Sequence, residues 1–355
     1  MLSRVAERIY WMARYLERAE DIARIINVNT HLVLDLPKKA TLGWMPLIEI
    51  TGNKRLFNDL YEEANERNVI RFMINDTNNG GSLLNSIINA RENARTIRDI
   101  IPRDAWERVN NLHIITKSQL PQGLSRRNRY EFLHSVIGGI QLTTGLLAGT
   151  MTHNFGYDFL RIGRNLERAD MTTRIVDVRS TNLLPEESTE LVPYETIQWM
   201  SILQSLSAYE NYRQFSQTRV QGSQVLKYLL QDTQFPRSFL HCLGEMQSSL
   251  QNLPRHRPPL RYLNQIIREM KTIDLESLKR KAAHRLLDDL QLQLAKFHKL
   301  VNDTYFTTKI ETKTKTTTKT KTKPKPKKAP NKTNRPKKAA TAHSKSLQIL
   351  ENRIG

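Results

Sequence analysis

The sequence predicts an all-α protein, an internally duplicated helical bundle followed by a disordered basic tail. Apolar residues recur at spacings of three and four, as in Val5, Ile9, Met12 and Leu16, which is typical of helices packed along one stripe. Proline and glycine are sparse through about the first 300 residues, and no segment alternates as a strand does. A charged block also occurs twice, about 150 residues apart.

The first half begins with a predicted helix from Leu2 to about Leu34, which Pro37 ends. Turn-forming residues separate the next predicted segments, which cover about 41–50, 69–74, 82–100, 104–115 and 126–151, with a turn at 121–123. The last helix holds four glycines near one face, Gly138, Gly139, Gly145 and Gly149. Interior glycine costs up to about 1 kcal/mol against alanine, so we expect these positions to be points of close helix–helix approach.

The second half begins with a predicted helix from about Tyr157 to Ser180. Further helices are expected over about 193–214, 220–230, 236–253, 259–270 and 275–305.

Two blocks repeat in the same order. Arg14–Arg24 returns as Arg164–Arg174, and Val69–Leu84 resembles Val225–Leu240 at a nearly equal offset. The period is far longer than that of a solenoid repeat. We therefore predict one helical domain over 1–306, with halves of about 1–150 and 151–306 related by a pseudo-two-fold axis, and a tail over 307–355.

The net charge of +20 is concentrated in the tail. Residues 309–345 hold thirteen lysines, one arginine and one acid, so the rest of the chain carries only +7. A Lys/Thr/Pro-rich segment cannot bury a core and is expected to be disordered. It has the charge for non-specific contact with a polyanion and lacks aromatics for base stacking. A merely solubilising tail is the alternative.

The single cysteine, Cys242, excludes an intramolecular disulfide framework and fits a reducing compartment. The N-terminus lacks the apolar core of a signal peptide, and no apolar run reaches the roughly 18 residues of a membrane span. A cytoplasmic protein with no membrane contact is expected. His241 and Cys242 diverge by about 100° on a helix, so Cys242 is interpreted as a buried structural residue.

Five segments carry a family resemblance: 1–20, 90–95 followed by Trp106-Glu107, 159–170, 207–213 and 235–238. In this order they resemble the bacterial alpha-E family over residues 1 to about 306. The resemblance implies an all-helical protein whose genes lie beside those of a circularly permuted ATP-grasp ligase and a transglutaminase-like protein. It therefore implies an accessory or substrate-binding component of a peptide-ligation or peptide-processing system, with those two proteins as partners. The chain departs from the family's aromatic-rich pattern at 153–157.

The repeated block supplies the candidate site. On a helical projection Arg14, Glu17, Asp21 and Arg24 share one side, opposite the apolar stripe. They form either a solvated face with pairs such as Arg14–Glu17 and Glu20–Arg24, or, with the second copy, one buried cluster. The candidate ligand-binding residues of the two copies are Arg14, Glu20, Arg24, Arg164, Asp170 and Arg174.

Glu17 and Glu167 are the candidates for acid/base catalysis, because a desolvated glutamate can have a raised pKa, although neighbouring arginines lower it again. An ion-pair network, a binding cleft and a catalytic site all remain open for this cluster. Arg91, Glu92 and Glu210 either form surface pairs or complete the same cleft.

No metal or cofactor is predicted. A carboxylate-bridged metal site in a bundle needs paired Glu-x-x-His motifs, and Glu131-x-x-His134 occurs once, while arginines flank the other candidate glutamates. No P-loop or dinucleotide motif is found.

Overall fold

The computed structural model describes residues 3–35, 43–181, 192–216 and 219–307. Within these ranges the chain forms fifteen α-helices, a short π-helix and no strand, so the all-α class is confirmed. Residues 1–308 form one compact unit. The predicted disorder and polyanion contact of the tail concern residues beyond 307, which lie outside the described ranges.

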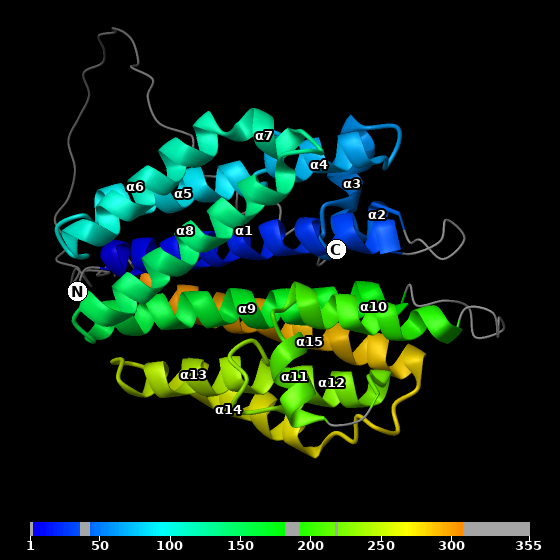
Figure 1. Cartoon of the computed structure of the whole chain (residues 1–355). Coiled ribbons are helices and arrows are strands. Elements are labelled where there is room, and N and C mark those ends of the chain that lie inside the picture. The colour runs from blue at the N-terminus through cyan, green and yellow to red at the C-terminus, as the bar shows by residue number, and fades with distance from the viewer. Residues whose placement is uncertain (1–2, 36–42, 182–191, 217–218, 308–355) are drawn as a thin grey trace, which may run out of the picture. The chain divides into compact units, whose positions relative to one another are not determined.

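The helices fall into two sets that follow each other along the chain (Figure 1). The first set is α1 (Ser3–Asp35), α2 (Met45–Thr51), α3 (Lys54–Leu60), α4 (Glu66–Ile74), α5 (Leu83–Thr96), α6 (Arg103–Ser118), α7 (Leu120–Leu124) and α8 (Arg129–Thr150). The second set is α9 (Phe155–Thr181), α10 (Val192–Ser205), α11 (Tyr209–Phe215), α12 (Gly222–Gln231), α13 (Phe239–Gln251), α14 (Arg257–Thr272) and α15 (Arg280–Val301), followed by the π-helix Asn302–Phe306.

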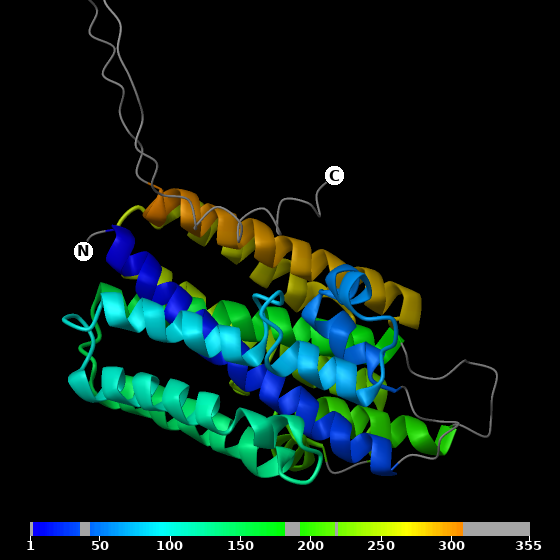
Figure 2. The ribbon, with the colours of Figure 1, turned by 90° about the horizontal axis from the view of Figure 1, so that it is seen from above.

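The two long helices α1 and α9 run side by side in the same direction through the middle of the bundle (Figure 1). Helix α1 also packs against α5 and α8, and α9 packs against α13 and α15. Seen from above, α15 lies along one edge and α6 and α8 along the opposite edge (Figure 2). The order of packing partners is thus the same in the two sets, although the predicted duplication itself stays a prediction.

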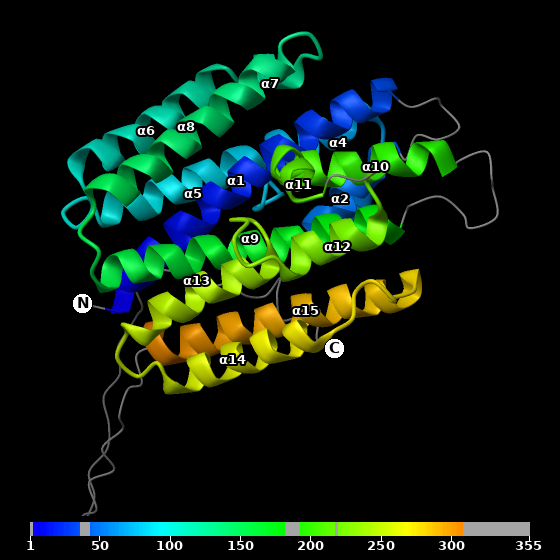
Figure 3. The same ribbon diagram turned by 60° about the horizontal axis from the view of Figure 1, so that its bottom comes forward.

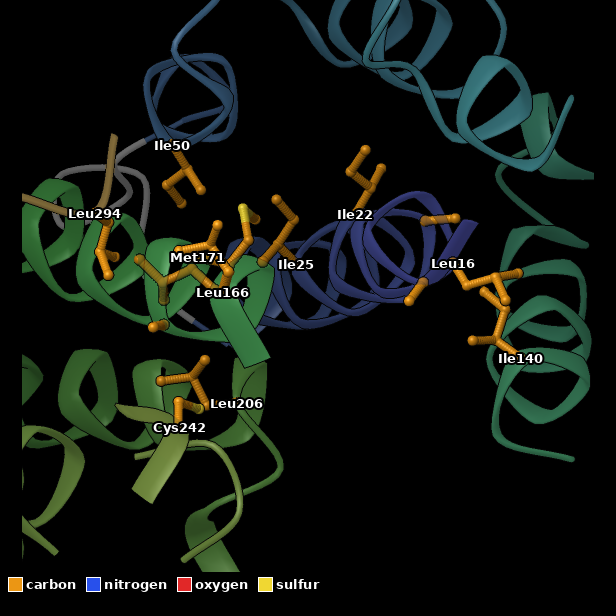
Figure 4. Packing of buried hydrophobic residues seen from close by; sticks show 14 of the residues in the cluster. Leu16, Ile22, Ile25, Ile50, Ile140, Leu166, Met171, Leu206, Cys242 and Leu294 are labelled. Atoms are coloured by element: carbon orange, nitrogen blue, oxygen red, sulfur yellow. The ribbon is translucent and has the colours of Figure 1, made fainter. Parts of the chain in front are cut away.

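Helix α1 is buried on nearly all sides, since it is covered by α5, α8 and α9 together. Its apolar residues Leu16, Ile22 and Ile25 point to different neighbours, and Leu16 lies beside Ile140 of α8 (Figure 4). The backbones of α1 and α9 approach each other closely at Gly163, where a Cβ atom would lie 2.4 Å from the carbonyl oxygen of Tyr10. Only glycine permits this approach.

The helix predicted over 193–214 is broken in two. Ser207 has a φ of 53°, in the left-handed region that a non-glycine residue rarely adopts, and α11 turns away from α10 there (Figure 3). Two other local predictions were also wrong. The polar stretch before residue 69 contains α3 and the start of α4, which the Asn65 side chain caps by accepting from the Asn68 N–H, and residues 121–123 belong to the short helix α7.

The prediction for the α8 glycines was right at one position and wrong at three. A Cβ at Gly139 would lie 2.8 Å from Leu112 of α6, whereas Gly138, Gly145 and Gly149 face open space. By length and composition α8 is also the one described helix that could cross a membrane. This is weak support for a membrane span, because a helix of a soluble bundle passes the same test.

Candidate functional site

The repeated Glu-Arg pairs of α1 and α9 exchange partners where the two helices meet. Arg168 Nε donates to Glu17 Oε1 at 2.6 Å, and Arg18 Nε donates to Glu167 Oε1 at 2.5 Å. Because the helices are parallel and close, residue 17 of one lies beside residue 168 of the other, and residue 18 beside residue 167. Each glutamate therefore forms its ion pair with the arginine of the other copy and not with the arginine next to it in its own helix.

Each glutamate holds a second arginine. Arg14 Nε donates to Glu167 Oε2 at 2.7 Å, and Arg237, in the segment before α13, places Nη1 2.9 Å from Glu17 Oε1. Glu17 is 2% exposed and Glu167 is 1% exposed. Two buried carboxylates thus lie in the interior with four guanidinium groups around them, an arrangement in which charged hydrogen bonds are strong.

The arginines keep both glutamates ionised. Burial alone would raise the pKa of Glu167, but Arg18 and Arg14 outweigh it and lower the pKa to about 2. For Glu17 burial is opposed by Arg168 and Arg237, and the pKa is again below its usual value. Burial also disfavours the charge of Arg14, yet Glu167 raises its pKa.

Arg237 is the principal residue that the sequence analysis did not select. Its Nη1 also donates to Asp21 Oδ1 at 2.7 Å, and its Nη2 donates to Glu20 Oε1 at 3.0 Å. One guanidinium shared by three acids cannot neutralise all of them. Burial raises the pKa of Asp21 to about 8, Arg237 opposes this rise, and Glu17 and Glu20 add to it.

Asp21 is therefore the acid of the cluster that is largely protonated near neutral pH, despite its contact with Arg237. Its Oδ2 atom has no hydrogen-bond partner among the described residues.

The remaining members form pairs within each helix. Arg24 Nη2 donates to Glu20 at 2.7 Å, as predicted, and Arg174 Nε donates to Asp170 at 2.9 Å. The predicted Arg14–Glu17 pair is wrong, because Arg14 reaches across to Glu167.

The solvated-face interpretation is wrong as well, because α9 and the segment before α13 cover the charged side of α1. On α9, Arg164 is also largely buried. Burial lowers its pKa, and its Nε has no partner in the described part of the chain.

A pocket of about 280 Å³ opens beside this cluster. Its walls come from α1, α8, α9, the junction of α10 and α11, and the segment before α13, and the lining residues are Glu20, Arg24, Gln141, Thr144, Arg168, Leu206, Ser207, Asn211, Phe235, Pro236 and Arg237. The pocket joins the charged interior to the surface, so a ligand in it would contact Arg168 and Arg24 directly.

The other candidates lie apart from the cluster. Arg91 and Glu92 pair with each other on the outside of α5, where Arg95 also contacts Glu92. Glu210 is exposed on α11, next to the pocket residue Asn211. Catalytic and ligand-binding roles for all these residues stay predictions.

Potential metal ligands and the thiol lie elsewhere. Glu131 and His134 are exposed on α8. In the described residues only Asp177, His284 and Asp288 bring potential ligand atoms within 4.8 Å of one another. The His284 ring, however, already contacts both carboxylates. Cys242 is fully buried, and burial raises the pKa of its thiol to about 12.

The chain also matches a known protein family. A family model described as a predicted alpha-helical domain with a conserved ER motif matches residues 1–306. The chain belongs to the Alpha-E family. In this Alpha-E chain Glu-Arg occurs five times, at residues 7–8, 17–18, 66–67, 107–108 and 167–168. The occurrences at 17–18 and 167–168 form the charged contact between α1 and α9.

The Alpha-E chain also resembles longer mycobacterial proteins. Uncharacterized proteins of Mycobacterium bovis and Mycobacterium tuberculosis are 24% identical to it over 324 residues, which covers 84% of this chain and 36% of each relative. A further uncharacterized M. tuberculosis protein is 23% identical over the same length. The chain therefore spans about a third of the length of these relatives. No solved structure matches it.

Proposed function

We propose that this Alpha-E protein is an accessory, substrate-binding component of a cytoplasmic peptide-ligation or peptide-processing system. Its partners in this proposal are an ATP-grasp ligase and a transglutaminase-like protein. The observation that carries the binding role is the pocket beside the Arg/Glu cluster, which is lined by Arg24, Arg168 and Arg237.

The segments that resemble the family support this site. Glu20, Arg168, Asn211 and Arg237 come from four separate matching segments and all line the same pocket. Residues this far apart in sequence share no local structure. The feature common to them is the pocket, which favours a ligand-binding role over a purely local one.

The geometry gives less support to an enzyme that uses Glu17 and Glu167 as acid and base. A general acid must carry a proton near the working pH, and an effective base needs a pKa not far below it. Glu167 has a pKa of about 2, the pKa of Glu17 is also lowered, and each carboxylate already holds two arginines. Glu17 is better suited to fixing Arg168 and Arg237, which line the pocket. Glu167 is better suited to fixing Arg14 and Arg18.

The length of the relatives supports a partner. In the mycobacterial proteins the matched region makes up 36% of the chain, so it is joined to further polypeptide. By analogy, we propose that this Alpha-E domain also acts beside other polypeptide.

Co-purification tests the proposal. The full chain, tagged and expressed at its natural level, is isolated from cells that also express the two expected partners. We expect both to be recovered in amounts that scale with the bait. Recovery of neither, with both confirmed in the lysate, would contradict the proposal. As a control, an Arg103→Ala variant, altered at an exposed residue of α6, should recover both partners in the same amounts as the unaltered chain.

A polyanion-binding tail remains a separate proposal that rests on the charge of residues 309–345. DNA binding by the full chain and by residues 1–306 is compared across a salt series. Tail binding predicts a steep salt dependence that the shorter chain lacks, and equal binding by both chains excludes it.

A further inference from the structure

We infer that the pocket binds the terminal carboxylate of a peptide-sized ligand through the two Nη groups of Arg168. This inference rests on the proposed binding function and names the group that is recognised. Three observations support it: the pocket arginines have hydrogen-bond donors without partners in the described ranges, the cluster carries excess positive charge, and Glu20, the one acid on the pocket wall, already accepts several hydrogen bonds.

Within the described part of the chain, the pocket contains hydrogen-bond donors without partners. Arg168 uses only its Nε, which donates to Glu17, so its two Nη groups have no partner among the described residues. Glu17 fixes the plane of the guanidinium from behind, since that carboxylate is itself held by Arg237. A fixed guanidinium with both Nη groups free matches the two oxygens of a carboxylate. Arg24 likewise leaves its Nη1 unused, because its Nε and Nη2 both donate to Glu20.

The charge of the cluster favours an anion. Seven arginines (Arg14, Arg18, Arg24, Arg164, Arg168, Arg174 and Arg237) surround five acids (Glu17, Glu20, Asp21, Glu167 and Asp170). Two positive charges are in excess when Asp21 is ionised and three when it is protonated, so an anionic ligand would compensate them in this largely buried site.

The lining also argues against recognition of an ammonium group. Glu20 is the one acid on the pocket wall. Its Oε1 already accepts from Arg24, Arg237 and Gln141, and two of these donors are cations that offset its charge, although its Oε2 has no hydrogen-bond partner among the described residues. Apart from Glu20 and the three arginines Arg24, Arg168 and Arg237, the wall is apolar or neutral, with residues such as Leu206, Phe235 and Asn211. The volume of about 280 Å³ lies at the lower limit of small-molecule sites. This suits one terminal residue with an apolar side chain.

Ser207 supplies a further donor. It lines the pocket at the break between α10 and α11, with a φ of 53°, and its buried hydroxyl has no partner within the described residues. Unpaired polar groups held in a rare backbone conformation are concentrated at ligand sites. We assign this hydroxyl to the second carboxylate oxygen, which a rotation of the Ser207 side chain towards the pocket would allow it to reach.

Calorimetric titration of the full chain tests the inference with four probes: glycyl-phenylalanine, its N-acetyl form, its C-terminal amide and inorganic phosphate. We expect the two free acids to bind with similar Kd values. The amide should bind about 10- to 100-fold more weakly, because it loses charged hydrogen bonds. Equal binding of acid and amide, binding of phosphate alone, or no binding of either acid overturns the inference.

Two variants locate the site. Arg168→Lys keeps a cation for Glu17 but lacks the guanidinium geometry, and Ser207→Gly removes the hydroxyl while glycine accepts the positive φ. Both should weaken acid binding by about tenfold or more, and Ser207→Gly should do so without loss of thermal stability. Unchanged Kd values in the folded Ser207→Gly and Arg168→Lys proteins contradict the assignment. Carboxylate binding without partner recovery contradicts only the proposed function, and partner recovery without carboxylate binding contradicts only this inference.

Discussion

Replacing Glu167 with glutamine tests whether the exchanged pairs hold the two halves together. The change removes a carboxylate that is 1% exposed and leaves Arg14, 8% exposed, without its counter-charge. Breaking a buried ion pair costs about 3–5 kcal/mol. Arg18 is partly exposed and regains water, so we expect about 3–4 kcal/mol, or a fall in Tm of roughly 5–6 °C for a domain of this size.

The control is Glu92→Gln. Glu92 also contacts two arginines, Arg91 and Arg95, but its side chain is 44% exposed, and exposed pairs contribute only about 0–1 kcal/mol. Urea denaturation followed by circular dichroism compares both variants with the parent protein. Similar losses of stability for Glu167→Gln and Glu92→Gln would refute the argument from burial.

The pH dependence gives a second check on the same residue. The folded pKa of Glu167 is about 2, whereas an unfolded glutamate titrates at about 4.3. The unfolded state therefore binds more protons between these values, so the stabilisation by ionised Glu167 is complete above about pH 4.3 and is lost as the pH falls towards 2. The stability gap between parent and Glu167→Gln should narrow at pH 3. A gap that stays constant between pH 7 and pH 3 would mean that charge is not its cause.

Three further predictions follow from buried positions. Gly163→Ala should destabilise by about 1–3 kcal/mol, because its Cβ would meet the Tyr10 carbonyl, whereas Gly138→Ala, in open space on α8, should stabilise by about 0.5–1 kcal/mol, as measured by thermal denaturation. The raised pKa of Asp21, about 8 against about 3.9 unfolded, means that the folded state keeps a proton that the unfolded state releases. Stability should thus fall as the pH rises from 4 to 8, and Asp21→Asn should flatten that slope in urea titrations. Cys242 is buried with a pKa of about 12, so iodoacetamide at pH 8 should label it only in denaturant, and rapid labelling of the native protein would show that the thiol is accessible.

The sequence predicts the helices and the two charged blocks well, because hydrophobic periodicity and internal similarity are properties of the chain alone. It does not predict which charges pair. A helical projection compares residues of one helix, and so it suggested Arg14–Glu17, whereas the parallel contact of α1 with α9 pairs Arg14 with Glu167. The partner across a helix interface depends on register, which periodicity does not specify.

Arg237 was missed for a related reason. It has no counterpart in the first half, where the aligned position is Gly81, so the repeat gave no signal for it. The signal available was the resemblance of residues 235–238 to the family, combined with the rarity of buried arginine. The left-handed Ser207 that ends α10 could not be predicted, because serine has no preference for positive φ and the break is imposed by tertiary packing.

The exchange of partners between Glu17-Arg18 and Glu167-Arg168 makes each half the counter-ion of the other. A chain cut in the connection between α8 and α9 would give two fragments, each with a glutamate and an arginine turned towards an absent neighbour. Neither fragment could bury its long helix without that neighbour, so the two should be stable only as an obligate heterodimer. An isologous dimer interface produces the same geometry. Because each half supplies the counter-ions of the other, the fold is stable only when both halves are present.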